Sequence, residues 1–240
     1  MIKAVLFDLD GTLLPVNTDE LIKAYLGLLS RKFSGLVDSG EFIRALMYST
    51  GKMMDNRDPA KLNRDVFMEE FIPLMGKAEP ELEAMFLEFY AQDFPGLISY
   101  AAPRKESRDT VLRALDRGWD VVIATNPVFP EQAVVERLKW IGVSGADCRL
   151  ITSYENMHFC KPYLEYYREI LEHIEREPSE CLMVGNDVEE DLAAAELGIK
   201  TVLVTDYLIN RRGKEYRADF ITTLEKLPNL MRNRDFPNLK

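Results

Sequence analysis

Cysteine is scarce in this chain of 240 residues, which contains Cys148, Cys160 and Cys181. An odd number without a Cys-x-x-Cys pair indicates neither a disulfide framework nor a zinc site, and reduced thiols are typical of cytoplasmic proteins. No apolar run approaches the roughly 20 residues of a membrane-spanning helix. The apolar start of the chain is cut short by Asp8 and Asp10, which argues against a signal peptide. The sequence therefore predicts a cytoplasmic protein without a membrane partner.

Basic residues are in deficit, with 30 Lys and Arg against 40 Asp and Glu, and the formal net charge is −10. Nucleic acids and anionic membranes select basic surfaces, so neither is expected as a partner. An anionic ligand would need cations placed locally. No Walker-type glycine-rich loop and no Ser-His-Asp arrangement is visible. The 47% hydrophobic content suffices for a folded core, and the length suits one large domain or one domain with a smaller insert.

Short apolar runs alternate with helical patterns over much of the chain. The runs that predict strands span residues 2–7, 119–124, 181–184 and 200–204, with weaker candidates at 149–151 and 219–221. Helical patterns lie near 106–117, 130–140, 162–176 and 189–197. Strands that alternate with helices of this length are typical of βαβ units. The sequence therefore predicts an α/β fold with a parallel sheet.

Residues 16–99 interrupt this alternation. Asn17, followed by Glu20, is a plausible N-cap, and apolar residues then recur at helical spacing without any strand pattern. Prolines mark the segments 14–16 and 94–103 as the joints. The expected organisation is an α/β core of residues 1–15 and 100–240 with an inserted all-helical domain of residues 16–99.

The strongest chemical signal follows the first predicted strand, in the string Asp8-Leu9-Asp10-Gly11-Thr12. Residues i and i+2 of an extended chain point the same way, so Asp8 and Asp10 are expected to face one site. Two carboxylates this close repel each other unless a cation lies between them or one is protonated. Mg²⁺ takes one or two carboxylates together with substrate phosphate. One carboxylate can attack phosphorus while the other moves protons.

This string resembles the first motif, DxDGT, of the haloacid dehalogenase (HAD) superfamily, whose other motifs follow here in the expected order. The second motif expects Thr or Ser at the end of a strand, and Thr125 stands there with Asn126 beside it. The third expects a lysine that begins a helix, which Lys161-Pro162 matches. Order and position make the set far more specific than any one motif.

The fourth motif expects acidic residues after a strand and a glycine. Here it reads Gly185-Asn186-Asp187, followed by Asp191. Asn186 stands where aspartate more commonly follows the glycine, so the register of the metal ligands is open. Asp187 is the favoured ligand, Asn186 the alternative, and Asp191 either a further ligand or a residue that supports the others. Asp187 and Asp191 would share one face if a helix has begun there.

The resemblance implies a Rossmann-like core and a Mg²⁺-dependent phosphatase that acts on a small phosphorylated metabolite. Asp8 would attack phosphorus to form an aspartyl-phosphate, and Asp10 would protonate the leaving oxygen and later activate water. Thr125, Asn126 and Lys161 would hold the phosphoryl oxygens. The implied metal ligands are Asp8, Asp10 through its main-chain carbonyl, Asp187 and Asp191.

The position of the insert, between the first and second motifs, resembles that of a helical C1 cap. Such a lid excludes water when closed and releases product when open. Arg44, Lys52 and Arg57 are candidate contacts for an anionic substrate. A phosphosugar mutase of the β-phosphoglucomutase type and a non-catalytic binding protein on the same scaffold stay open as alternatives. A dehalogenase is disfavoured, because family dehalogenases lack the equivalent of Asp10.

Overall fold

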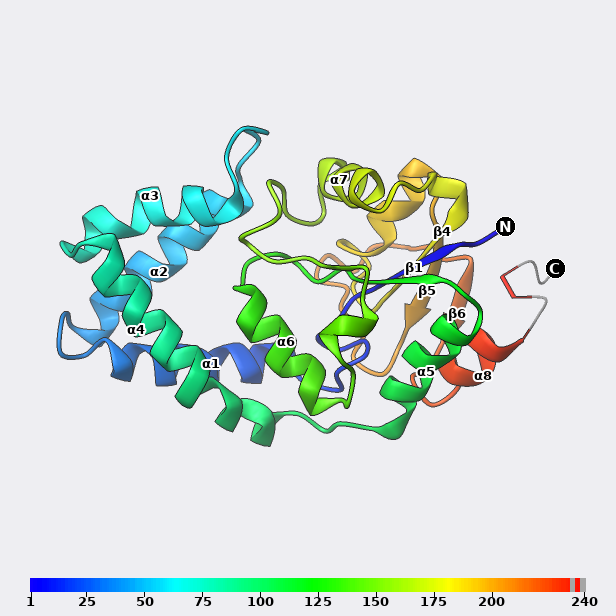
Figure 1. Cartoon of the computed structure of the whole chain (residues 1–240), viewed down its shortest axis with the longest axis horizontal. Helices are drawn as coiled ribbons and strands as arrows, with labels where there is room; N and C mark the ends of the chain where they lie inside the picture. Colours follow the sequence, from blue (N-terminus) through cyan, green and yellow to red (C-terminus); the bar gives the residue numbers. More distant parts are fainter. Residues whose placement is uncertain (234–235, 238–240) are drawn as a thin grey trace.

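Six strands form one parallel sheet in the computed structural model, which describes residues 1–233 and 236–237 (Figure 1). Their order across the sheet is β3-β2-β1-β4-β5-β6. They are β1 (Ala4–Phe7), β2 (Asp120–Ile123), β3 (Leu150–Ile151), β4 (Cys181–Gly185), β5 (Lys200–Val204) and β6 (Phe220–Thr222). Every expected strand is present, and the predicted α/β fold with a Rossmann-like sheet is confirmed. Residues 234–235 and 238–240 of the expected core domain lie outside the described residues.

Alternate residues of the central strand serve opposite faces of the sheet. Val5 and Phe7 belong to an apolar cluster that includes residues of α5 (Lys105–Asp116), α6 (Glu131–Trp140) and α8 (Leu227–Arg232). Ala4 and Leu6 belong to a second cluster, which includes residues of α7 (Leu164–Ile174). All of β1 is buried, which explains why it reads as a continuous apolar run. The buried strand therefore fixes the position of the backbone from which the next residues, beginning with Asp8, continue.

The segment between β1 and α5 is helical, as expected. It contains α1 (Thr18–Lys32), α2 (Ser39–Met54), α3 (Asn63–Met75), α4 (Glu79–Gln92) and the 3₁₀ helix η1 (Phe94–Tyr100). The expected N-cap Asn17 accepts hydrogen bonds from the N–H groups of Asp19 and Glu20. No helix in the described part of the chain is long and apolar enough to span a membrane.

The insert lies beside the sheet, with α6 between them in Figure 1. Its two connections to the core run alongside each other, because the Ala102 N–H donates to the Pro15 carbonyl (2.8 Å). Side chains of the insert and of the core nevertheless belong to one continuous apolar cluster. The separation into domains at residues 16 and 99 therefore remains a prediction.

One expected helix start is wrong. Helix α7 begins at Leu164 with Tyr163 as its N-cap, and not at Lys161-Pro162. The Tyr163 N–H donates to the Cys160 carbonyl (3.1 Å), so Lys161 lies in a turn that precedes the helix. The lysine is thus positioned by a turn rather than by a first helical turn.

The helix expected at 189–197 is also shorter than predicted. Residues 188–191 form a turn, which is followed by a 3₁₀ helix, η4 (Leu192–Leu197). The Asp191 N–H donates to the Asp187 carbonyl (2.9 Å), and Asp191 Oδ2 accepts from the Asp187 N–H (2.9 Å). The two aspartates therefore close one turn and do not share a helix face.

Candidate active site

The carboxyl ends of β1 and β4 bring the first and fourth motifs together. β2 and β3 lie on one side of β1 in the sheet, and β4, β5 and β6 lie on its other side, so the direction of strand order reverses between β1 and β4. Open α/β sheets bind ligands beyond the carboxyl ends of their strands at such a switch point. The Asp8 N–H donates to the Val184 carbonyl (2.9 Å), so the pairing continues to the first residue beyond β1. Asp8 is thereby placed next to the loop that follows β4.

Lys161 joins two carboxylates at this edge. Its Nζ donates to Asp8 Oδ1 (3.0 Å) and to Asp191 Oδ1 (2.6 Å), and its side chain is 1% exposed. Burial alone would lower the pKa of Lys161, but the charges of Asp191 and Asp8 outweigh it and hold that pKa well above its usual value. The ammonium therefore stays charged. Two carboxylates share it, and when both are ionised they leave an excess of negative charge that a further cation would offset.

Asn186 is held against the loop that follows β1. Its Oδ1 and Asp8 Oδ2 each lie 2.9 Å from the Thr12 hydroxyl, and its Nδ2 donates to the Tyr207 carbonyl (2.6 Å). A Cβ atom on Gly11 would lie 2.4 Å from Asn186 Nδ2, and Gly11 has a φ of +84°. Glycine is required there both for the backbone and for this close approach. The Asn186 amide therefore serves to link the two loops.

Asp187 is surrounded by a different set of donors. Its Oδ1 accepts from the N–H groups of Glu189 and Glu190 (2.9 Å each), and its Oδ2 pairs with Arg211. Burial raises the pKa of Asp187, and the hydrogen bond from Glu190 and the Arg211 charge act against that rise. The Arg211 side chain is 56% exposed, so it can leave Asp187 without losing a buried environment.

Thr125 and Asn126 follow β2, on the other side of β1 from the fourth motif. Asn126 Oδ1 accepts from the Lys161 N–H (3.2 Å), and its Nδ2 donates to Glu190 Oε2 (3.3 Å). Thr125 is 5% exposed, and its carbonyl accepts from two buried hydroxyls. The Thr125 hydroxyl itself makes no hydrogen bond to another described residue. The second motif thus contacts the third, and it leaves one hydroxyl for a ligand oxygen.

The Asp10 side chain is held by a residue that sequence reasoning missed. Arg137 of α6 pairs with Asp10 through Nη1, donates from Nε to the Ala133 carbonyl (3.1 Å) and is 1% exposed. The Arg137 guanidinium carbon lies 4.7 Å from the centroid of the Phe129 ring. Among the described residues, Asp10 Oδ1 and Arg137 Nη2 are buried without a hydrogen-bond partner. One oxygen of Asp10 is therefore held, and the other has no hydrogen-bond partner among the described residues.

A sequence signal for Arg137 does exist. Arg137 lies three and four positions after Val134 and Ala133, on the buried face of α6. Arginine is almost never fully buried unless it is paired, so a partner could be expected for it. The identity of that partner could not, because Asp10 is 127 positions away in the chain.

Replacement of Arg137 by Met is expected to lower turnover about tenfold or more. The resemblance implies that Asp10 transfers protons, and proton transfer by a positioned side chain accelerates a reaction by at least that factor. Asp10 would lose the donor that orients it, so kcat should fall more than KM rises. Steady-state kinetics on the best substrate would measure both quantities. Arg113→Met is the matched control, because the Arg113 side chain is 45% exposed. Wild-type kcat in a folded Arg137→Met protein would contradict a positioning role.

The oxygen atoms at this edge suit Mg²⁺ in kind. Asp8 and Asp187 provide carboxylates, and the Asp10 carbonyl accepts no hydrogen bond from another described residue. The described residues contain no group of three or more His, Cys, Asp or Glu that could hold a metal. Mg²⁺ requires no such group, since it takes one or two carboxylates and keeps water and substrate phosphate. Asp191 accepts hydrogen bonds from Lys161 Nζ and from the Asp187 N–H, so it holds the lysine and the loop, and its role as a metal ligand remains a prediction.

The chain matches known proteins in both sequence and structure. A family model described as haloacid dehalogenase-like hydrolase matches residues 2–207. Pyrophosphatase PpaX of Bacillus mycoides (strain KBAB4) is 26% identical over 234 residues, which cover 96% of this chain and 95% of that protein. Pyrophosphatase PpaX of Bacillus velezensis is 28% identical over 244 residues, with the same two coverages.

Among solved structures, a HAD phosphatase from Thermococcus onnurineus matches with a TM-score of 0.58 at 21% identity, over 96% of this chain and 98% of that one. The L-2-haloacid dehalogenase from Xanthobacter autotrophicus matches with a TM-score of 0.55 at 17% identity, over 98% and 100%. At these identities the likeness shows the fold alone. The family model covers most of the chain and all four motifs, and the chain therefore belongs to the haloacid dehalogenase-like hydrolases.

Proposed function

We propose that this hydrolase is a Mg²⁺-dependent phosphatase that removes phosphate from a small metabolite through an aspartyl-phosphate on Asp8. The observation that carries the proposal is the buried Lys161 ammonium, 3.0 Å from Asp8 Oδ1. A fixed cation in a dry site stabilises a phosphoryl group strongly. It also offsets the long-range repulsion between an anionic substrate and this acidic chain. The relatives named pyrophosphatase support the hydrolysis of a bond between phosphorus and oxygen.

The proposed reaction has two steps. Asp8 attacks phosphorus, and the bond between phosphorus and the leaving oxygen breaks while Asp10 gives that oxygen a proton. Asp10 then takes a proton from a water molecule that cleaves the bond between Asp8 and phosphorus, which releases phosphate. Arg137 holds one Asp10 oxygen during both transfers. The presence of Asp10 separates this chemistry from dehalogenation, which needs no second acid.

The other groups bind and orient the phosphoryl oxygens. The Thr125 hydroxyl, the Asn126 side chain and Lys161 would take these oxygens, and Asp191 keeps Lys161 in place. Mg²⁺, when held by the Asp8 and Asp187 carboxylates and the Asp10 carbonyl, would neutralise charge on the phosphoryl group. The helical insert would act as a C1 cap that excludes water. Of the candidate cap cations, Arg57 lies over the ring of Tyr163, two residues beyond Lys161.

Removal of metal is expected to abolish phosphate release. Purified protein would be assayed with a panel of small phosphate esters and inorganic pyrophosphate, in Mg²⁺, after EDTA, and after Mg²⁺ is restored. Release should fall to the level of an Asp8→Asn blank in EDTA and recover with Mg²⁺. Equal release with and without EDTA would contradict the metal requirement. Release from a folded wild type that never exceeds the blank would contradict the phosphatase itself.

A further inference from the structure

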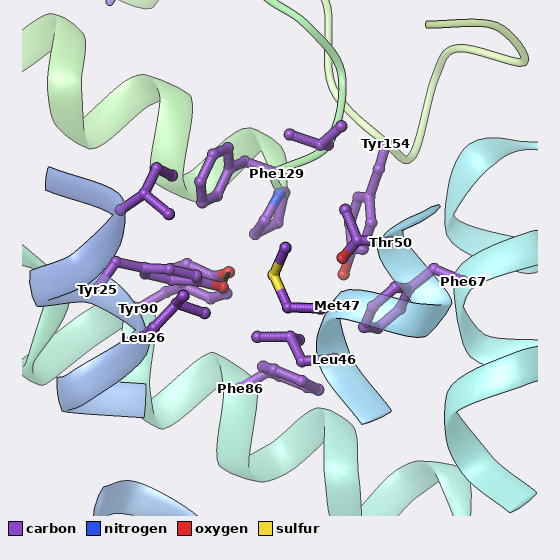
Figure 2. A pocket seen from close by; sticks show the side chains of 13 residues that line it. Tyr25, Leu26, Leu46, Met47, Thr50, Phe67, Phe86, Tyr90, Phe129 and Tyr154 are labelled. Carbon is purple, nitrogen blue, oxygen red and sulfur yellow. Dashed lines mark hydrogen bonds between the residues drawn. The ribbon is translucent and has the colours of Figure 1, made fainter. Parts of the chain in front are cut away.

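A cavity of about 130 Å³ lies between the insert and the core. Helices α1 to α4 form one side of it, and the loop that follows Thr125 and Asn126 forms the other through Val128, Phe129 and Pro130. Figure 2 shows the hydroxyls of Tyr25 and Tyr90 on one side of this space and those of Thr50 and Tyr154 on the other. The site of phosphoryl chemistry and the cavity thus share one loop.

The cavity wall carries no formal charge. Every residue that lines it is apolar, aromatic or hydroxyl-bearing, so no Lys, Arg, His, Asp or Glu of the described chain is among them. Burial raises the pKa of Tyr25 to about 12 and that of Tyr90 well above its usual value. The two hydroxyls bond to each other (2.9 Å) and stay neutral at physiological pH. An anionic group placed here would lose its hydration and find no cation among the residues that line the cavity.

The size of the cavity selects among uncharged groups. An apolar protein cavity of about 150 Å³ stays dry and binds benzene. The present volume of about 130 Å³ is close to that value, and the wall includes the rings of Phe67, Phe86 and Phe129. Offset and edge-on contacts with such rings favour another flat ring. The hydroxyls of Thr50 and Tyr154 make no hydrogen bond to another described residue, so they can accept one polar substituent.

Two contacts connect the cavity to Asp10. Phe129 lines the cavity with Tyr25, whose ring centroid is 5.2 Å from that of Phe129. The Arg137 guanidinium lies over the same Phe129 ring and pairs with Asp10. Asp10 is the residue that would protonate the leaving oxygen, so the rest of the leaving group must start beside it. Because the Arg137 guanidinium is already paired with Asp10, it is less able to bind a second phosphate group on the leaving group.

We propose that this cavity binds the leaving group of the substrate, and that this group is uncharged, apolar and about the size of a phenyl ring. The inference rests on the proposed phosphatase function. It separates the substrate from sugar phosphates, whose many hydroxyls would be desolvated here, and from pyrophosphate, whose leaving group is an anion.

Benzyl phosphate, glycerol 3-phosphate and inorganic pyrophosphate test the proposal. The first two release alkyl alcohols, so their difference reports mainly how the leaving group is bound. The value of kcat/KM should be about tenfold or more higher for benzyl phosphate than for either of the others. A preference for glycerol 3-phosphate or pyrophosphate would overturn the inference.

Leu26→Trp fills the cavity and should lower kcat/KM for benzyl phosphate about tenfold or more, so that the preference over glycerol 3-phosphate is lost. Leu87→Trp is the matched control, because Leu87 of α4 is 63% exposed and does not line the cavity. Thr50→Phe is a second filling variant that replaces Leu26→Trp if the latter does not fold. An unchanged preference for benzyl phosphate in a folded filling variant would contradict the assignment.

Binding of benzyl alcohol, measured by NMR or calorimetry, separates the cavity from the catalysis. Wild type should bind it, and the folded filling variant should not. Failure to hydrolyse these three compounds and every other ester of the panel would contradict the proposed phosphatase. In that case benzyl alcohol binding that the filling variant abolishes would still support the cavity assignment, and failure of wild type to bind it would refute that assignment.

Discussion

Replacement of Asp8 by Asn is expected to lower phosphate release by a factor on the order of 10⁴ or more, as removal of a nucleophile does in other hydrolases. The amide has nearly the shape of the carboxylate but lacks the charged oxygen that attacks phosphorus. Initial rates with the best substrate of the panel, at saturating Mg²⁺, would measure the loss.

The same variant should fold as well as wild type. The Asn oxygen can accept from Lys161 while its NH2 donates to the Thr12 hydroxyl, which can donate to Asn186 Oδ1, and Lys161 keeps its bond to Asp191. The buried cluster then holds one carboxylate and one ammonium, so its excess negative charge disappears. Asp116→Asn is the control for the loss of a carboxylate, because that side chain is 66% exposed. A folded Asp8→Asn protein with more than about a tenth of wild-type turnover would show that another group attacks phosphorus.

Replacement of Lys161 by Met is expected to lower the free energy of unfolding by about 3 kcal/mol or more, and to abolish turnover. Removal of one partner from a buried ion pair leaves an uncompensated charge, and here two carboxylates, Asp8 and Asp191, would lose the same ammonium. The phosphoryl group would also lose its fixed cation. Urea unfolding and steady-state kinetics would measure the two effects separately.

The Lys161 prediction has its own controls. Lys139→Met removes an ammonium whose side chain is 66% exposed, and it should change stability little. The double variant Lys161→Met with Asp191→Asn should be more stable than Lys161→Met alone, because one stranded carboxylate has been removed. If Lys161→Met unfolds at the wild-type urea concentration, the ion pairs do not stabilise the fold.

The strands and the helical insert could be predicted because their signals are local. A buried parallel strand such as β1 is apolar at every position, and the helices repeat their apolar residues at a fixed period. The four motifs could be placed for a related reason, since each sits where an element starts or ends. The helix starts at Lys161 and near Asp191 were wrong, because turns with hydrogen bonds of their own replaced the expected first helical turns.

Contacts between distant residues could not be predicted in the same way. The sequence motifs identify Asp8, Lys161 and Asp191 as candidate residues. They do not predict that the Lys161 ammonium bridges the two carboxylates. The hydrogen bonds of Asn186 with Thr12 and Tyr207 depend on how the folded chain brings these loops together. Each such contact depends on how two backbones approach, and no local pattern encodes that approach.

The sequence by itself determined the fold class, the helical insert and the four motifs that identify this hydrolase family, because backbone preferences and apolar periodicity act over a few neighbouring residues. Tertiary structure decided that Arg137 holds Asp10 and that four helices and the loop at Phe129 line an uncharged cavity. The physical reason is that burial and charge compensation belong to the packed assembly. A buried arginine is tolerated where a carboxylate from another element reaches it, and a cavity exists where several elements leave space together.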